Sequence, residues 1–305
     1  MKKPKVTIII LSWNTKKLLK RCLESLQLGA GNCETEVIVV DNGSTDGSKE
    51  LLQKLASNNS INQFIDLKKN FGFAKGNNQA LRQAQGDLIM LLNSDTFVEK
   101  EALEKLAVQL IKSEKIGAVS PLLINPDGSS QKEYYMKSPN LWQIFLYHNP
   151  ALRSLVMKTP LRRLIISEIK KEAPIEVDQL PGAALMAKRE VWQKVGFLDE
   201  DYQFLYEDVD WCFRAKKLGF KLLVVPEAKI MHLGGGSWKR KIRKNGFDFY
   251  QQFFSSLLLF VRKNYPSSQF LLFRLAIVVN FFLTARFRLA WFFLKGKVGQ
   301  KRLWR

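Results

Sequence analysis

The sequence has few cysteines and histidines, and neither type forms a disulfide or metal-binding pattern. Its 305 residues include 3 cysteines, at Cys22, Cys33 and Cys212, and 2 histidines. The odd number of cysteines disfavours a disulfide framework, and their spacing is unlike that of a structural zinc site. We therefore expect a protein with reduced thiols in a cytosolic setting.

Long uncharged apolar segments are also missing. The longest one near the C-terminus, Leu275 to Ala285, has 11 residues, whereas a membrane-spanning helix needs about 20. A clean transmembrane segment is therefore not expected, and no internal repeat or low-complexity segment is present. With 46% hydrophobic and 25% charged residues, the composition is typical of a globular protein of one large or two modest domains.

Acidic residues are scarce at the C-terminal end. From Trp238 onward, 15 Lys and Arg accompany the single acid Asp248, a net charge of +14, while the first 237 residues carry +6. Such a basic segment favours phosphate as a partner, either in nucleic acid or on an anionic membrane. Apolar residues from 253 to 294 with Arg, Lys and Trp at their margins favour helices in a membrane interface, although helices packed on the preceding domain remain an alternative.

The N-terminal half alternates short apolar runs with helical patterns. The predicted strands are Val6–Leu11, Glu36–Val40, Phe64–Leu67 and Leu88–Leu92, and the predicted helices span Lys16–Leu28, end near Ala56 and Ala84, and begin at Glu101. This alternation predicts a parallel sheet with right-handed crossovers, flanked by helices. Continuous apolar strands are typical of sheets that are covered on both faces.

The most informative stretch runs from Gly86 to Thr96. Five apolar residues lead directly into Asn93, Ser94 and Asp95. In parallel sheets, ligands bind beyond the carboxyl ends of the strands, and an acid there can hold a cation that in turn holds a diphosphate. The alternative is that Asp95 caps the following helix.

Four ordered motifs resemble those of family 2 glycosyltransferases. They are VIVVDNGSTDGS at 37–48, NFGFAKGNN at 70–78, LLNSDT at 91–96 and LYEDVDWCF at 205–213. The resemblance covers roughly residues 5–238 and is closest to bacterial rhamnosyltransferase-like members. It implies a GT-A fold with a mostly parallel sheet, and inverting transfer of a sugar from a nucleotide diphosphate donor.

The resemblance also implies a donor site. Ser12, Asn14 and Asp41 match positions that hold the base and ribose of the donor, and Lys75 matches a basic residue beside its phosphates. A carboxylate such as Asp41 can accept a hydrogen bond from a base N–H or a ribose hydroxyl. A lysine provides a point charge for phosphate.

The implied metal site departs from the family pattern. Asn93-Ser94-Asp95 stands where the family carries Asp-x-Asp, so only Asp95 is a carboxylate ligand for Mg²⁺ or Mn²⁺. Asn93 and Ser94 then contribute to donor binding. His232 precedes three glycines and matches a histidine that reaches the metal or diphosphate in related enzymes; a structural histidine is the alternative.

A second acidic cluster, Glu207-Asp208 and Asp210, opens a predicted helix that runs to Leu218. Acids in a first helical turn are also explained by the helix dipole. Inverting transfer, however, needs a carboxylate that takes the proton of the acceptor hydroxyl. The resemblance assigns this role to Asp208, with Glu207 orienting the site or contacting the acceptor and Asp210 as the fallback.

We therefore expect a GT-A catalytic domain at 1–238 and a basic, helical, membrane-docking segment at 239–305. The expected reaction moves rhamnose from dTDP-rhamnose to a lipid-linked glycan, at the cytoplasmic face of the membrane to which the enzyme binds peripherally. Two alternatives belong to other classes. A non-catalytic nucleotide-sugar-binding protein would explain Asn93. A nucleic-acid-binding protein would explain the charge, but the basic segment carries long apolar runs instead of a solvated groove.

Overall fold

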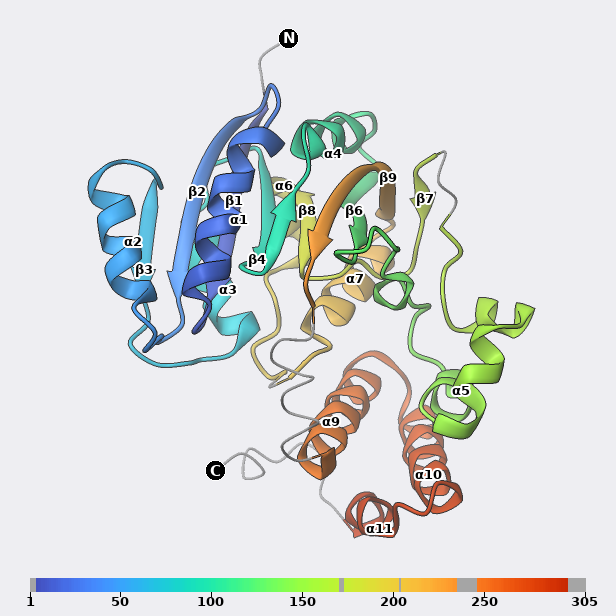
Figure 1. Cartoon of the computed structure of the whole chain (residues 1–305). Helices are drawn as coiled ribbons and strands as arrows, with labels where there is room; N and C mark the ends of the chain where they lie inside the picture. Colours follow the sequence, from blue (N-terminus) through green and yellow to red (C-terminus); the bar gives the residue numbers. More distant parts are fainter. Residues whose placement is uncertain (1–3, 170–172, 203, 235–245, 296–305) are drawn as a thin grey trace. The chain divides into compact units, whose positions relative to one another are not determined.

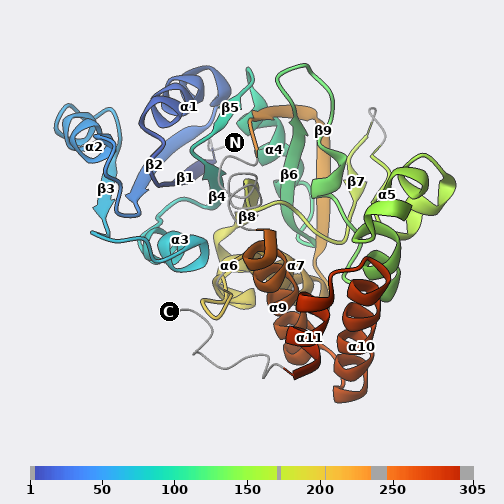
Figure 2. The same cartoon turned by 60° about the horizontal axis from the view of Figure 1, so that its bottom comes forward.

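The computed structural model describes residues 4–169, 173–202, 204–234 and 246–295 (Figures 1 and 2). The chain forms two compact units. The first comprises Met1–Met136, Glu168–Asp201 and Glu207–Gly234, and the second comprises Lys137–Ser167, Tyr202–Tyr206 and Gly235–Arg305.

The first unit is built on a mixed sheet with strand order β3-β2-β1-β4-β8-β6-β9-β5, and β7 pairs with β9. The strands are β1 (Lys5–Ser12), β2 (Glu34–Asp41), β3 (Gln63–Asp66), β4 (Leu88–Asn93), β5 (Thr96–Val98), β6 (Ile116–Ile124), β7 (Ile175–Glu176), β8 (Ala184–Lys188) and β9 (Lys221–His232). Strands β1 to β4 are mutually parallel, whereas β8 runs antiparallel to β4 and β6. The predicted, mostly parallel α/β sheet is confirmed.

Helices cover both faces of this sheet, as Figure 1 shows. The helices α1 (Lys16–Gly29), α2 (Ser48–Ser57) and α4 (Ala102–Ile111) contribute to one buried cluster, and α3 (Phe73–Leu81), α6 (Arg189–Val195) and α7 (Glu207–Lys217) contribute to another. Along β1, Ile8 and Ile10 belong to the first cluster and Ile9 to the second. Adjacent strand residues point to opposite faces, so two covered faces explain the continuous apolar runs.

Two local interpretations of the sequence are corrected. The alternative that Asp95 caps α4 is wrong, because β5 intervenes and the residue before that helix is Glu101. The sequence also predicts a strand at Lys221–Val225 that ends before Pro226, whereas β9 continues to His232. A register shift lets it do so: Pro121 pairs with Val225, and Leu122 pairs with Lys229. Such a bulge accommodates a proline, which cannot donate to the ladder.

The second unit is helical. It contains η2 (Gln143–Tyr147), α5 (Pro150–Met157), η3 (Pro160–Leu164), α9 (Gly246–Asn264), α10 (Ser267–Leu283) and α11 (Phe287–Lys295). His148 lies against Phe253 and Phe254, with ring centroids 4.8 and 5.2 Å apart. Residues 137–167 therefore share a core with the C-terminal helices. The expected domain boundary at 238/239 lies outside the described residues and stays a prediction.

None of the helices in the described parts of the chain is long and apolar enough to cross a membrane.

Candidate active site

Strands β1 and β4 end in polar side chains that are joined by hydroxyl groups. The Ser12 hydroxyl lies 2.9 Å from that of Thr15, which in turn lies 2.9 Å from the hydroxyl of Ser94. Ser12 and Ser94 are both buried. The structure thus brings two of the predicted donor-site residues together through Thr15, which the sequence argument did not include.

Asp41 ends β2 directly beside Ser12, with which it is in register. Its side chain is buried, and Oδ2 accepts a hydrogen bond from the Ser44 amide at 3.0 Å. The other oxygen, Oδ1, is buried without a hydrogen-bond partner among the described residues. A buried acceptor without a donor is costly, so Oδ1 is suited to a hydrogen bond from a ligand.

Asn14 has a role in the loop that follows β2. It adopts a left-handed conformation with a φ of 54°, which asparagine tolerates better than most residues. Its Oδ1 accepts a hydrogen bond from the Thr45 backbone amide at 2.7 Å, and the Asn14 backbone amide donates to Ser44 Oγ at 2.9 Å. The predicted contact with the donor remains a prediction.

Lys75 lies on α3 and is exposed. Its Nζ sits 4.7 Å from the centroid of the Phe71 ring. Asn42 fixes the loop that carries Phe71, because its Oδ1 accepts the Phe71 amide at 2.8 Å and its Nδ2 donates to Gly72 O at 3.3 Å. Asn42 thus joins the end of β2, which carries Asp41, to the start of α3, which carries Lys75, and no interaction between the side chains of Asp41 and Lys75 is seen.

Asn93, Asp95 and His232 form a cluster. His232 Nε2 lies 3.4 Å from Asp95 Oδ1 and 3.4 Å from Asn93 Nδ2. The proximity follows from the unexpected strand β5, which pairs Thr96 with His232. The histidine is buried, whereas the Asp95 carboxylate is 19% exposed. The cluster therefore has access to solvent on the side of the carboxylate.

Gln131 orients His232. Its Nε2 donates to Asn125 Oδ1 at 2.8 Å and to His232 O at 2.6 Å, so its Oε1 is the atom that faces His232 Nδ1 at 3.0 Å. Nδ1 is then the nitrogen that donates to Gln131, which leaves Nε2 as the nitrogen on the side of Asp95 that can ligate a metal. The Tyr134 ring packs against the imidazole in a T-shaped arrangement, with centroids 5.3 Å apart. An outer hydrogen bond of this kind is what orients metal-ligating histidines.

This donor set fits a divalent cation. Two ligands of one Mg²⁺ or Mn²⁺ lie roughly 3 Å apart, close to the 3.4 Å between Asp95 Oδ1 and His232 Nε2. Among the described residues, no three His, Cys, Asp or Glu side chains form a common metal-binding group. Two protein ligands are typical of ions that are also bound by water and substrate phosphates.

Glu207 and Asp208 begin α7. The two residues before them, Leu205 and Tyr206, have φ values of 60° and 77°. Non-glycine residues rarely adopt such angles, and strain of this kind concentrates at functional sites. Glu207 is buried, and its Oε2 has no hydrogen-bond partner in the described residues.

Burial raises the pKa of both carboxyl groups above the ordinary range. For Glu207 the neighbouring Asp208 charge adds to this effect. For Asp208 hydrogen bonds from the Gly182 and Val209 amides oppose it. Two adjacent acids resist double ionisation. Asp208 is half-buried and accepts two amide hydrogen bonds, whereas Glu207 is buried, so Asp208 is the better carboxylate and Glu207 holds its proton more tightly.

Two consecutive residues connect the Glu207–Asp208 pair to the cluster of Asn93, Asp95 and His232, which we call the metal-type cluster. Gly182 N donates to Asp208 Oδ2 at 2.8 Å, and Ala183 O accepts from Asn93 N at 2.9 Å. A Cβ atom on Gly182 would lie 3.1 Å from the Phe73 ring and 3.3 Å from Asp208 Oδ2. Glycine therefore permits the close approach that holds the Asp208 carboxylate in place.

Asp210, the fallback base, has a structural role. It is buried, and its Oδ2 accepts from Arg214 Nε at 2.7 Å. The same guanidinium donates to Val195 O at 2.5 Å and to Phe197 O at 2.9 Å. This ion pair holds α6 and α7 together, which leaves Asp208 as the stronger candidate.

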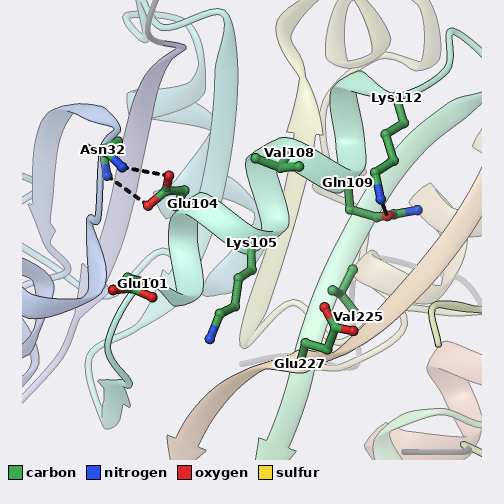
Figure 3. Close-up of a pocket in the computed structure, with 9 residues that line it drawn as sticks. All are labelled: Asn32, Glu101, Glu104, Lys105, Val108, Gln109, Lys112, Val225 and Glu227. Carbon is green, nitrogen blue, oxygen red and sulfur yellow. Dashed lines mark hydrogen bonds between the residues drawn. The ribbon is translucent and has the colours of Figure 1, made fainter. Parts of the chain in front are cut away.

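A separate hollow lies at the opposite end of the sheet (Figure 3). Glu101 and Glu104 line it together with Lys105, Lys112 and Asn32, which lies in the turn before β2. Glu104 already accepts hydrogen bonds from the Asn32 amide and side chain, at 3.1 and 2.8 Å. None of the predicted site residues lines this hollow.

Comparisons with known proteins place the chain in a family. The sequence of residues 7–168 matches glycosyl transferase family 2, and the chain belongs to this family. It is 26% identical over 246 residues to the poly-beta-1,6-N-acetyl-D-glucosamine synthase of Staphylococcus aureus strain COL, covering 78% of this chain and 53% of the relative. It is 39% identical over 101 residues to the uncharacterized glycosyltransferase YfnE of Bacillus subtilis, covering 33% of this chain and 26% of the relative. The chain thus spans about half the length of the synthases that it matches.

Solved structures share the fold. The mannosyltransferase PcManGT from Pyrobaculum calidifontis, in complex with GDP-Man and Mn²⁺, matches 95% of this chain and 74% of its own at a TM-score of 0.58 and 16% identity. S. aureus TarS 1-349 matches 96% of this chain and 76% of its own, at a TM-score of 0.54 and 18% identity. These likenesses confirm the predicted GT-A fold.

Proposed function

We propose that the protein is an inverting glycosyltransferase that moves a sugar from a nucleotide diphosphate donor to a lipid-linked cell-surface glycan. The favoured donor is dTDP-rhamnose, because the motifs are closest to those of rhamnosyltransferase-like members. The carrying observation is the link from Asp208 through Gly182 and Ala183 to Asn93. This link supports a site in which the proton acceptor Asp208 and the cluster around Asn93, which would bind the donor phosphates, are held in fixed positions relative to each other.

The donor nucleotide would bind at the ends of β1 and β2. Asp41 Oδ1 is a buried acceptor that awaits a donor, and a base N–H or ribose hydroxyl would supply one. Lys75 would add a positive charge near the phosphates. Asp95 and His232 would hold Mg²⁺ or Mn²⁺, which neutralises charge on the leaving diphosphate when bound.

Asp208 would act as the general base. The acceptor hydroxyl oxygen bonds to the anomeric carbon as the bond from that carbon to the diphosphate breaks, and the hydroxyl proton passes to Asp208. The Gly182 amide keeps the carboxylate oriented. A pKa raised by burial brings a carboxylate closer to the operating pH, which makes it a better proton acceptor. Glu207 would orient the site or contact the acceptor.

The reaction would take place at the cytoplasmic face of the membrane, where a lipid-linked acceptor resides. The basic character of the C-terminal segment supports peripheral binding to that surface. The relatives support a role in polysaccharide synthesis, since one of them is a poly-beta-1,6-N-acetyl-D-glucosamine synthase.

A screen of nucleotide sugars would test the proposal. Purified full-length protein is incubated with each donor and Mg²⁺ or Mn²⁺, and released nucleoside diphosphate is measured. We expect release from dTDP-rhamnose above that from other donors, and its loss in Asp208→Asn. Release from a different donor would overturn the assignment of rhamnose, and no release from any donor would overturn the activity.

Asn93 in place of an acid favours one second candidate, a non-catalytic nucleotide-sugar-binding protein. That protein would bind a donor without turnover under every metal and acceptor condition. Equilibrium binding measured alongside release separates the two.

A further inference from the structure

Exposed apolar side chains are concentrated in the second unit. Among the described residues, 21 large hydrophobic side chains are exposed, and 15 of them belong to this unit, which holds about a third of the chain. Nine lie on α10 and α11, namely Leu271, Leu272, Leu275, Val279, Phe282, Leu283, Phe287, Trp291 and Leu294. We call these nine residues the α10–α11 face.

The nine residues lie along one side of each helix, and the two sides meet at Phe282 and Phe287. On α10 they follow helical spacing, as in Leu271, Leu275 and Leu283, and therefore share one side of the helix. On α11, Phe287 and Trp291 share a side in the same way. The Phe282 and Phe287 rings, with centroids 5.9 Å apart, join the two stripes.

Basic groups accompany this face. Lys295 Nζ lies 4.3 Å from the centroid of the Trp291 ring. Arg274 donates to Phe293 O at 2.8 Å and to Leu294 O at 2.9 Å, which fastens α11 to α10. The sequence has no acid after Asp248. The second unit as a whole has 20 Lys and Arg against that single acid, a net charge of +19, whereas the first unit has +1.

We propose that the α10–α11 face docks into the headgroup region of an anionic lipid bilayer. This deepens the membrane part of the proposed function by naming the surface. Leu, Phe and Trp side chains next to Arg and Lys are the composition that binds such an interface, through apolar burial and attraction to anionic lipid. A net charge of +19 opposes a second copy of the chain on this face.

Vesicle binding by the full-length protein tests the proposal. Sedimentation with phosphatidylcholine vesicles is compared with sedimentation with vesicles that also contain phosphatidylglycerol. The variant Leu275→Ser/Trp291→Ser changes two residues of the face that are 59% and 55% exposed. The matched control, Val108→Ser/Ile111→Ser, changes residues of α4 in the first unit that are 47% and 52% exposed.

We expect the wild type and the control to bind only the anionic vesicles, and the face variant to bind them about tenfold or more weakly. High salt should weaken the binding of the wild type without abolishing it, because only the charge component is screened. Brominated lipid should quench fluorescence of the wild type more than that of Trp291→Phe. Surface substitutions are preferable to removing the segment, since its helices share a core with residues 137–167.

Three results would overturn the proposal. The full-length protein could ignore anionic vesicles at low salt, or the face variant and the control could bind them equally. Alternatively, sedimentation in solution could show a dimer that only the face variant dissociates, which would make a second copy the partner. Donor turnover and transfer to a soluble acceptor test the proposed function separately, and the face variant should retain both.

Discussion

The two units present contrasting surfaces. The first balances 28 basic residues against 27 acidic ones, and the second combines a charge of +19 with most of the exposed apolar side chains. In the first unit the unusual groups are buried carboxylate oxygens without a hydrogen-bond partner among the described residues, at Asp41 and at Glu207 of α7. The bulk charge of the chain therefore describes the second unit and says little about the candidate site.

If the first unit carries out catalysis and the second binds the membrane, substitutions in the first unit should alter turnover and leave vesicle binding intact. Asp208→Asn should give the largest effect, a fall in turnover of about 10²-fold or more, because it removes the proton acceptor. Donor affinity should change little. The measurement is release of nucleoside diphosphate, with Asp87→Asn as control, since that carboxylate is exposed and precedes the same strand whose far end carries Asn93.

Near-wild-type turnover in Asp208→Asn would contradict this assignment. Glu207 would then be the remaining candidate for the base. Altered vesicle binding in the same variant would contradict the assignment of catalysis and vesicle binding to separate units.

The metal-type cluster should give the next largest effect. Asp95→Ala should abolish metal-dependent donor binding, because it removes the carboxylate that lies 3.4 Å from His232 Nε2. His232→Ala should weaken it, and Asn93→Asp should tighten binding of the metal by adding a charged ligand. Free Mn²⁺, measured by electron paramagnetic resonance with and without nucleoside diphosphate, reports these changes. Full activity in excess chelator would show that the cluster works without a metal.

Much of this arrangement could be predicted from the sequence, because it depends on local patterns. Apolar runs between helical segments predicted the sheet, and polar residues after β1, β2 and β4 predicted which edge carries the site. The helix that begins at Glu207 was predicted from the helical spacing of Asp208, Cys212 and Ala215, and it ends at Lys217, one residue before the predicted end. The family membership followed from motifs that lie within single loops.

Contacts between distant segments could not be predicted. The bulge at Pro226 that extends β9 to His232 depends on pairing with β6. Gln131 stands 101 residues before His232 in the chain, and no spacing rule connects them. The grouping of residues 137–167 with the C-terminal helices likewise follows from a core that only the folded chain forms. The roles of the site residues remain predictions.

Gln131 should give a moderate effect. Gln131→Leu removes the acceptor that keeps the proton on His232 Nδ1, and Mn²⁺ affinity should fall about tenfold. Gln131→Glu keeps an acceptor oxygen there and should retain more affinity. Nitrogen chemical shifts of labelled histidine report the tautomer directly, and the chain has only two histidines to assign. An unchanged tautomer and affinity in Gln131→Leu would remove Gln131 from the site.

Glu207 should give the smallest effect that we predict, a change in the pH dependence of stability. Burial and the neighbouring Asp208 raise the pKa of Glu207 above its unfolded value. The folded protein therefore keeps a proton that the unfolded chain has lost, so stability is full below the unfolded pKa and falls as the pH rises through the raised one. Glu207→Gln removes this titration while keeping the shape of the protonated acid.

The melting temperature of Glu207→Gln should match that of the wild type near about pH 5 and exceed it by a few degrees near about pH 9. Glu24→Gln, which changes an exposed carboxylate 3.8 Å from Lys20, should show no such dependence. An equal difference at both pH values would mean that Glu207 is ionised in the folded protein throughout, and a lower melting temperature at high pH would mean that its charge is stabilising. Vesicle binding should follow the wild type in either case, because Glu207 belongs to the first unit and the α10–α11 face to the second.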